Sequence, residues 1–277
     1  MKKSDVPVKI LKMKPARKVI IDLLHLGLKV SRIHAYGEDD CTEALQRLNV
    51  ISEKLGRKIS FTAYLATCWA STIYNHKIMH AYRRRNKIVL FEDVDVACVV
   101  ERDIVDKKVP TSYIIREAQN KNVVHISDEI QEAKQSKSET AATSTKKLKQ
   151  SKASLITRLP GFIRRFILKH MTKNPWLKKE IFGTVGLSSI GMFTMGSGSA
   201  IPVTVHSSTF IVGGIAKKPW VVGNEIKIRD IITGTISMDH DLVDGGPAAR
   251  AIAELRNKIR ECHGLNAIEK ELGIQYD

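Results

Sequence analysis

Residues 238–245 read Met-Asp-His-Asp-Leu-Val-Asp-Gly, and this stretch decides the fold. The segment before it, Gly234 to Met238, is typical of a strand, and residues 246–263 carry apolar side chains at helical spacing. A histidine just past a strand end is held by rigid structure and stays open to a cleft. Its imidazole titrates near neutrality, which suits a general base. Alone, a histidine beside an aspartate is more typical of a structural role. The catalytic interpretation therefore depends on the surrounding sequence.

A second block lies upstream at residues 182–193, Phe-Gly-Thr-Val-Gly-Leu-Ser-Ser-Ile-Gly-Met-Phe. Shorter pieces accompany it in order: Pro-Ala-Arg-Lys at 15–18, Phe-Glu-Asp-Val-Asp-Val at 91–96 and Ile-Val-Gly-Gly-Ile at 211–215. Together these blocks resemble the catalytic domain of the dihydrolipoyl acyltransferases of 2-oxo acid dehydrogenase complexes, within the chloramphenicol acetyltransferase-like superfamily. The resemblance covers nearly the whole chain. The order of predicted strands and helices indicates α+β, and the resemblance implies a two-layer mixed sheet with helices on one face.

The resemblance also implies the site residues and their roles. His240 would act as the general base that takes the proton from the attacking thiol or hydroxyl. Ser188 would donate a hydrogen bond to the oxyanion of the tetrahedral intermediate. Asp244 would not touch substrate but would pair with an arginine near the N-terminus, here Arg17, and fix the loop that aims the histidine. Gly245 would leave room for the backbone beside it.

Coenzyme A or acyl-coenzyme A is the substrate that the resemblance implies, with contacts expected from Ser189, Gly191, Ser197 and Gly198. Family members are trimers in which the histidine comes from one subunit and the hydroxyl from its neighbour, so we expect a homotrimer with inter-subunit sites. The chain departs from the family pattern at Ser189, where asparagine is usual, and at Asp241, where arginine is common.

The formal net charge of +16 would attract phosphorylated ligands, nucleic acid or an anionic membrane surface. The excess concentrates in residues 9–18, in 83–87 and in 146–179. This excess of positive charge would attract the phosphate groups of coenzyme A. Aromatic residues make up only 6% and are not interleaved with the basic clusters, so we expect no specific nucleic-acid binding.

We expect one catalytic domain over residues 1–277, with a basic mobile insertion at about 135–179. Residues 135–154 are rich in Lys, Ser, Thr, Ala and Gln, which is typical of a loop. Residues 155–171 alternate apolar and basic side chains at helical spacing, which fits a lid or packing helix, or a weak contact with a membrane surface. Other predicted elements include a helix from Ser60 to about Asn75, a helix over 113–121 and a strand over 202–206.

Cys41, Cys68, Cys98 and Cys262 are scattered, so the sequence predicts neither a structural disulfide nor a zinc or other metal site. No apolar run approaches the length that spans a bilayer, and the first residues lack a signal-peptide stretch. A cytoplasmic protein is therefore expected.

Three functions stay open. Because the sequence shows no lipoyl domain and no lipoyl attachment site, we expect a free-standing acyltransferase that moves an acyl group between coenzyme A and an unidentified acceptor. Alternatively, the chain is a core acyltransferase of a 2-oxo acid dehydrogenase complex that uses a lipoyl domain on a separate protein. A third reading is a catalytically silent scaffold of the same fold, against which the presence of His240, Ser188 and Asp244 argues.

Overall fold

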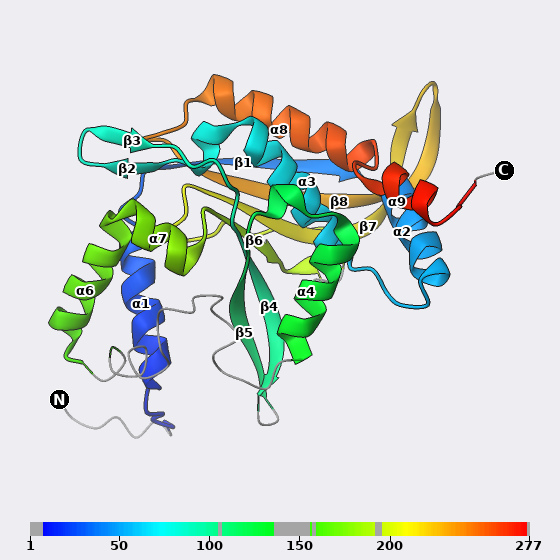
Figure 1. Ribbon diagram of the computed structural model, residues 1–277. Coiled ribbons are helices and arrows are strands. Elements are labelled where there is room, and N and C mark those ends of the chain that lie inside the picture. Colours follow the sequence, from blue (N-terminus) through cyan, green and yellow to red (C-terminus); the bar gives the residue numbers. More distant parts are fainter. Residues whose placement is uncertain (1–7, 105–106, 136–155, 157–158, 192–195, 276–277) are drawn as a thin grey trace.

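A six-stranded mixed sheet forms the centre of the protein (Figure 1). The computed structural model describes residues 8–104, 107–135, 156, 159–191 and 196–275. The strand order is β1-β8-β7-β6-β4-β5. The strands are β1 (Arg32–Asp40), β4 (Val96–Ile104), β5 (Lys107–Ile115), β6 (Val185–Ser189), β7 (Ser208–Val222) and β8 (Glu225–Asp239).

Strand β6 is the one short strand in this sheet, and it runs parallel to both neighbours, β4 and β7. The remaining pairs, β1 with β8, β7 with β8, and β4 with β5, are antiparallel. Strands β7 and β8 continue past the sheet as a long hairpin, visible at the upper right of Figure 1. Gly223 turns this hairpin with a φ of 61°, a left-handed value that glycine adopts without strain.

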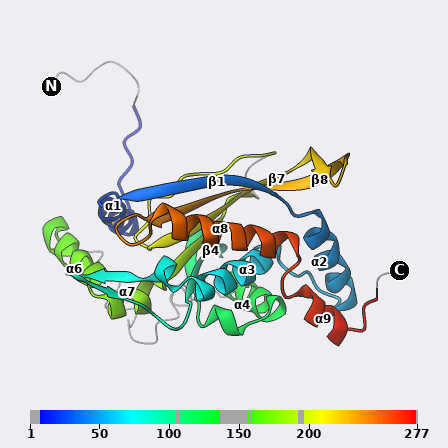
Figure 2. The ribbon, with the colours of Figure 1, turned by 90° about the horizontal axis from the view of Figure 1, so that it is seen from above.

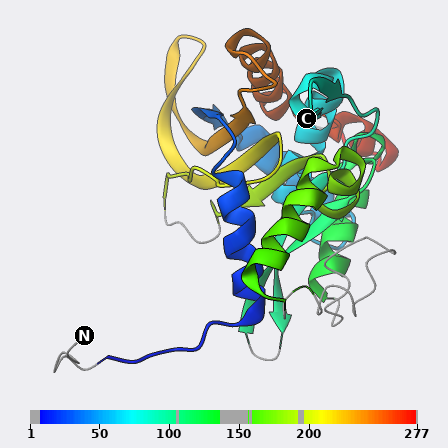
Figure 3. The same cartoon turned by 90° about the vertical axis from the view of Figure 1, so that its left-hand side faces the viewer.

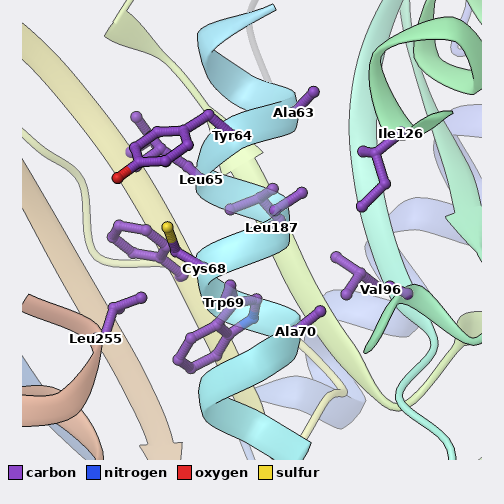
Figure 4. Close-up of a cluster of buried hydrophobic side chains, with 14 of the residues drawn as sticks. Ala63, Tyr64, Leu65, Cys68, Trp69, Ala70, Val96, Ile126, Leu187 and Leu255 are labelled. Atoms are coloured by element: carbon purple, nitrogen blue, oxygen red, sulfur yellow. The ribbon is translucent and has the colours of Figure 1, made fainter. Parts of the chain in front are cut away.

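Helices cover one face of the sheet. Figure 2 shows α3 (Phe61–Asn75), α4 (Val123–Gln135) and α8 (Gly245–Arg260) on the same side, with α2 (Thr42–Lys54) and α9 (Leu265–Glu271) at one end. Helix α3 lies in the middle and is buried on almost all sides, as its nearly continuous apolar sequence requires. Figure 4 shows Tyr64, Cys68 and Trp69 on one side of it and Ile126 and Val96 on the other. The Trp69 and Phe210 rings are 5.8 Å apart, which ties α3 to β7.

The second face of the sheet carries smaller and more polar side chains. Residues alternate between the faces along each strand, so Val185 and Leu187 point into the core while Ser188 points away from it. One row across this second face is fixed by the strand register: Tyr36, Thr235, Ile211, Ser188 and Val99. Tyr36 is 62% exposed and Val99 41% exposed. Within one chain, the two ends of this row, on either side of Ser188, are therefore exposed to solvent.

The remaining elements gather at the end of the sheet opposite α2 and α9 (Figure 1). They are α1 (Pro15–Gly27), the short hairpin of β2 (Tyr82–Arg84) and β3 (Lys87–Val89), α6 (Gly161–Lys173) and α7 (Pro175–Phe182). Figure 3 shows α1 and α6 side by side. Arg164 Nε donates to Asp22 Oδ2 at 2.5 Å, and both side chains are buried. This ion pair joins α6 to α1.

The structure confirms the predicted α+β class and the layer of helices on one face. The predicted helix over 113–121 is wrong: β5 continues to Ile115, because Tyr113 pairs with Cys98 of β4, and a short 3-10 helix follows at Ala118–Asn120. Residues 202–206 do not form the predicted strand. Of the predicted basic insertion, residues 136–155 and 157–158 lie outside the described residues. Gln135 ends α4, and most of residues 159–179 belong to α6 and α7.

All four cysteines are buried and unbridged. Among the residues that the structure describes, none of the helices has the length and apolar character needed to cross a bilayer.

Candidate active site

The turn that follows β8 holds His240 in place by its backbone. The N–H of Asp239 donates to the carbonyl of Ser207, and the N–H of His240 donates to the carbonyl of Ser31, each at 2.8 Å. Three residues further on, Val243 is 1% exposed and anchors the turn in the core. Helix α8 then starts at Gly245. The predicted strand, turn and helix around His240 are therefore confirmed, and the histidine backbone is fixed from both sides.

The side chain of His240 is half-exposed, with 46% of its surface open. Its Nδ1 lies 3.9 Å from Oδ1 of Asp244, which is 88% exposed. That separation is too long for a hydrogen bond but close enough for an electrostatic contact. Because Nδ1 faces Asp244, Nε2 is the nitrogen left for a substrate. Asp241 pairs with Arg83 of β2 across 3.1 Å, so its charge beside the base has a partner.

The predicted buried ion pair of Asp244 with Arg17 is not present within this chain. Asp244 is exposed, and Arg17 lies in the first turn of α1, at the far end of that helix from the turn at His240. The arginine that the fold brings to the turn is Arg32, which stands opposite Asp239 in the pairing of β1 and β8. Its guanidinium donates to the carbonyls of Thr204 and His206 at 2.8 and 2.7 Å.

Two partly buried titratable groups, Lys178 and His206, lie close to the start of the turn. Burial lowers the pKa of Lys178 to about 7; the charge of Asp239 opposes this shift, and that of Arg32 adds to it. The Lys178 ammonium lies 3.7 Å from the centre of the Tyr82 ring. Burial likewise lowers the pKa of His206 to about 4. The two nitrogens of His206 contact Thr204 Oγ1 at 2.9 Å and the Phe182 carbonyl at 2.7 Å, so this imidazole is neutral and structural.

Ser188 lies at a different level of the sheet from His240. The register places Ser188 beside Ile211 and Ile211 beside Thr235, which is five residues before His240. At roughly 3.3 Å per residue and roughly 4.8 Å per strand, the two residues are roughly 19 Å apart. One substrate carbonyl cannot touch both residues of the same chain.

The predicted coenzyme contacts gather near Ser188 and not near His240. Gly191 and Gly198 approach the β7 bulge so closely that a Cβ on Gly191 would lie 2.3 Å from the Gly213 carbonyl oxygen. A Cβ on Gly213 would in turn lie 2.0 Å from the Gly198 oxygen. These glycines therefore have a packing role in the structure. Ser197 is exposed beside them, and Ser189 lines a cavity of about 170 Å³ next to β4.

Three side chains near His240 were missed by the sequence analysis as site residues: Arg32, Arg83 and Lys178. Arg83 was noticed only as part of a basic cluster, and nothing in its local sequence indicates Asp241 as a partner 158 residues away. Arg32 opens the strand that pairs with β8, and only this pairing brings it to the turn.

Two relatives match about a third of the chain. The dihydrolipoyllysine-residue acetyltransferase component of the pyruvate dehydrogenase complex of Zymomonas mobilis is 30% identical over 92 residues, which are 33% of this chain and 19% of that protein. The lipoamide acyltransferase component of the branched-chain alpha-keto acid dehydrogenase complex of Pseudomonas aeruginosa is 38% identical over 82 residues, 28% of this chain and 19% of that protein. The matched stretch thus spans less than a fifth of these relatives.

Solved structures share the whole fold at lower identity. The dihydrolipoamide acetyltransferase of Azotobacter vinelandii superposes with a TM-score of 0.69 at 16% identity, covering 96% of this chain and 98% of that chain. A probable dihydrolipoamide acetyltransferase from Listeria monocytogenes gives 0.68 at 16% identity, covering 92% and 95%.

A family model decides the assignment. The model described as 2-oxoacid dehydrogenases acyltransferase (catalytic domain) matches residues 6–155 and 178–266. These stretches include the turn at His240, strand β6 with Ser188 and helix α1 with Arg17, while residues 156–177 fall between them. The chain belongs to the family of 2-oxoacid dehydrogenase acyltransferase catalytic domains.

Proposed function

We propose that this protein transfers an acyl group between coenzyme A and a thiol or hydroxyl acceptor, with His240 as the general base. The observation that carries the proposal is the half-exposed imidazole of His240, held on a rigid turn of a family catalytic domain and free at Nε2. A base in such a place can approach a substrate proton without moving the backbone.

The reaction balances without a covalent enzyme intermediate. Nε2 of His240 takes the proton of the acceptor thiol, and the thiolate attacks the carbonyl carbon of the acyl-coenzyme A thioester. A tetrahedral oxyanion forms and collapses by breaking the bond to the coenzyme sulfur. The leaving sulfur takes the proton back from His240. Ser188 donates a hydrogen bond to the oxyanion, which is the point at which negative charge develops.

The site is completed by a second subunit. Because His240 and Ser188 are roughly 19 Å apart in one chain, the serine that serves a given histidine comes from a neighbour. The open flanks of the row around Ser188, at Tyr36 and Val99, offer a surface for that neighbour. A closed homotrimer supplies one such contact per site. In this assembly Ser189, Gly191, Ser197 and Gly198 border the coenzyme, next to the serine.

A dihydrolipoyl group is the acceptor to test first. Both relatives are acyltransferase components of dehydrogenase complexes whose names specify a lipoyl or lipoamide group.

The test is acetyl transfer from acetyl-coenzyme A to free dihydrolipoamide by the wild type, His240→Ala and His125→Ala. His125 is also exposed but lies on α4, away from the turn, and serves as the matched control. We expect His240→Ala to lower kcat by about 10²–10⁴, the usual contribution of a general base, while His125→Ala keeps the wild-type rate. A fully active His240→Ala protein would refute the assignment of the base.

Titration calorimetry with coenzyme A separates the remaining outcomes. Coenzyme A binding without transfer to dihydrolipoamide would point to another acceptor. Absence of both binding and transfer would identify a silent scaffold.

A further inference from the structure

A large basic cavity lies between the β2–β3 hairpin and the junction of α6 and α7. Its volume is about 1090 Å³, and it is lined by Arg83, Arg84, Arg85, Asn86, Lys87, His170, Lys173 and Asn174. Five of these side chains carry a formal positive charge. None of the lining residues that the structure describes is a carboxylate. Among the residues that the structure describes, Arg83 alone of the five has an acidic partner, Asp241, which lies on the turn of His240.

Such a concentration of like charge costs free energy that a bound anion would offset. Cationic side chains around a concave surface repel one another, and the walls focus their field into the cavity. Arginine donors also suit phosphate oxygens, with which they form paired, charge-assisted hydrogen bonds. The chemistry of the cavity therefore favours a ligand with several phosphate groups over a single small anion.

The local structure holds these side chains toward the cavity. Arg85 occupies the tight hairpin turn with a φ of 54°, a left-handed value that is strained for an arginine. Its carbonyl accepts a hydrogen bond from Arg83 Nε at 3.1 Å. Arg84 packs over the ring of Trp176 at 4.7 Å, which joins the hairpin to α7. Asn174 caps α7 by accepting from the N–H groups of Trp176 and Leu177.

One wall of this cavity lies outside the part of the chain that matches the family. His170, Lys173 and Asn174 belong to residues 156–177, between the two stretches matched by the family model. This segment is fixed to the body through the buried pair of Arg164 with Asp22. The family model therefore does not account for this wall of the cavity.

We propose that this cavity binds a soluble ligand carrying two or more phosphate groups. The ligand contacts Arg84, Arg85 and Lys87 from the hairpin and Lys173 from α6. It also reaches Arg83, so the bound anion competes with Asp241 for that guanidinium, one residue from His240. The proposal does not depend on acyl transfer, because its readout is binding.

The test uses titration calorimetry of the full chain with inorganic tripolyphosphate. The test variant combines Arg85→Glu, Lys87→Glu and Lys173→Glu. The matched control combines Lys54→Glu, Lys58→Glu and Lys270→Glu, which are exposed at the opposite end of the molecule and change the net charge equally. Thermal melts establish that each variant is folded. If the triple glutamate variant does not fold, a variant with glutamine at the same three positions replaces it.

We expect the wild type to bind tripolyphosphate and the test variant to bind at least about tenfold more weakly, since it loses several charge-assisted contacts. The glutamine version should fall in between, and the control should stay within about twofold of the wild type. Equal weakening in the test and control variants would show an unspecific charge effect and overturn the proposal. No binding by the wild type would also overturn it.

Two further measurements identify the source of the phosphates. Displacement of tripolyphosphate by coenzyme A would make the coenzyme the occupant, whereas simultaneous binding would show a separate ligand; the proposal holds in both cases. Binding only to vesicles of phosphatidylcholine with phosphatidylserine would overturn it. That result would instead assign the interaction to the exposed Phe162 and Phe166 of α6.

Discussion

Mixing two inactive variants should restore activity if each site uses His240 of one subunit and Ser188 of another. The perturbation is a pair of single variants, His240→Ala and Ser188→Ala. Each alone loses either the base, worth about 10²–10⁴ in rate, or one oxyanion donor, worth about 10²–10³. Each is therefore nearly silent by itself.

The expected recovery follows from the geometry. The base has to lie about 2.6–3.2 Å from the proton that it takes, and the oxyanion donor about 2.7–3.1 Å from the oxygen. The register places the two residues of one chain roughly 19 Å apart, so they serve different sites. In trimers assembled from an equal mixture, about a quarter of the sites combine an intact histidine with an intact serine from the neighbour. Activity should rise to about a quarter of the wild-type value.

The assay refolds the two variants together from denaturant and measures acetyl transfer at fixed total protein. The control mixes each single variant with the double variant His240→Ala, Ser188→Ala, which can form no complete site. Activity of the mixture no higher than the mean of the separate variants would refute the inter-subunit site, provided that refolded wild type regains its rate.

Two further outcomes are expected. Asp22→Asn should lower the free energy of unfolding by about 3–5 kcal/mol in urea titrations, because Arg164 is then left buried with a neutral partner. Adding Arg164→Met to this variant should recover part of the lost stability. A loss below about 1 kcal/mol for Asp22→Asn would contradict a buried ion pair. Lys178 should make stability rise with pH above about pH 7. The folded chain releases this proton near 7, whereas an unfolded lysine keeps it to about 10.5, so the unfolded chain binds more protons in this window. Lys178→Met should flatten the rise between about pH 7 and pH 8.5, and an unchanged slope would show that Lys178 does not titrate there.

The local sequence was sufficient to predict those elements whose structure depends on neighbouring residues. The strand from Gly234 to Met238, the turn at His240 and the apolar spacing of α8 all depend on neighbouring residues, and the structure confirms them. Helix α3 was also predicted, from Ser60 to about Asn75, and the structure confirms it over Phe61–Asn75. The same approach failed at 113–121. Tyr113, Ile114 and Ile115 suit both a helix and a strand, and the pairing with β4 decides in favour of the strand.

Contacts between distant segments lay beyond the sequence. The position of Arg32 opposite Asp239 depends on the register of β1 with β8, and a shift by one residue would turn its side chain to the other face. The exposure of Asp244 within one chain could not be read from its motif either.

By itself, the sequence determined the α+β class, the family blocks and the strand, turn and helix that present His240, because these depend on neighbours within a few residues. Only the tertiary structure decided that Ser188 stands far from His240 in the same chain, that Arg83 reaches Asp241 and that α6 closes a basic cavity with the β2–β3 hairpin. The physical reason is that strand register and helix docking are set by the burial of the whole core. The local spacing of apolar residues does not indicate which distant residues that burial brings into contact.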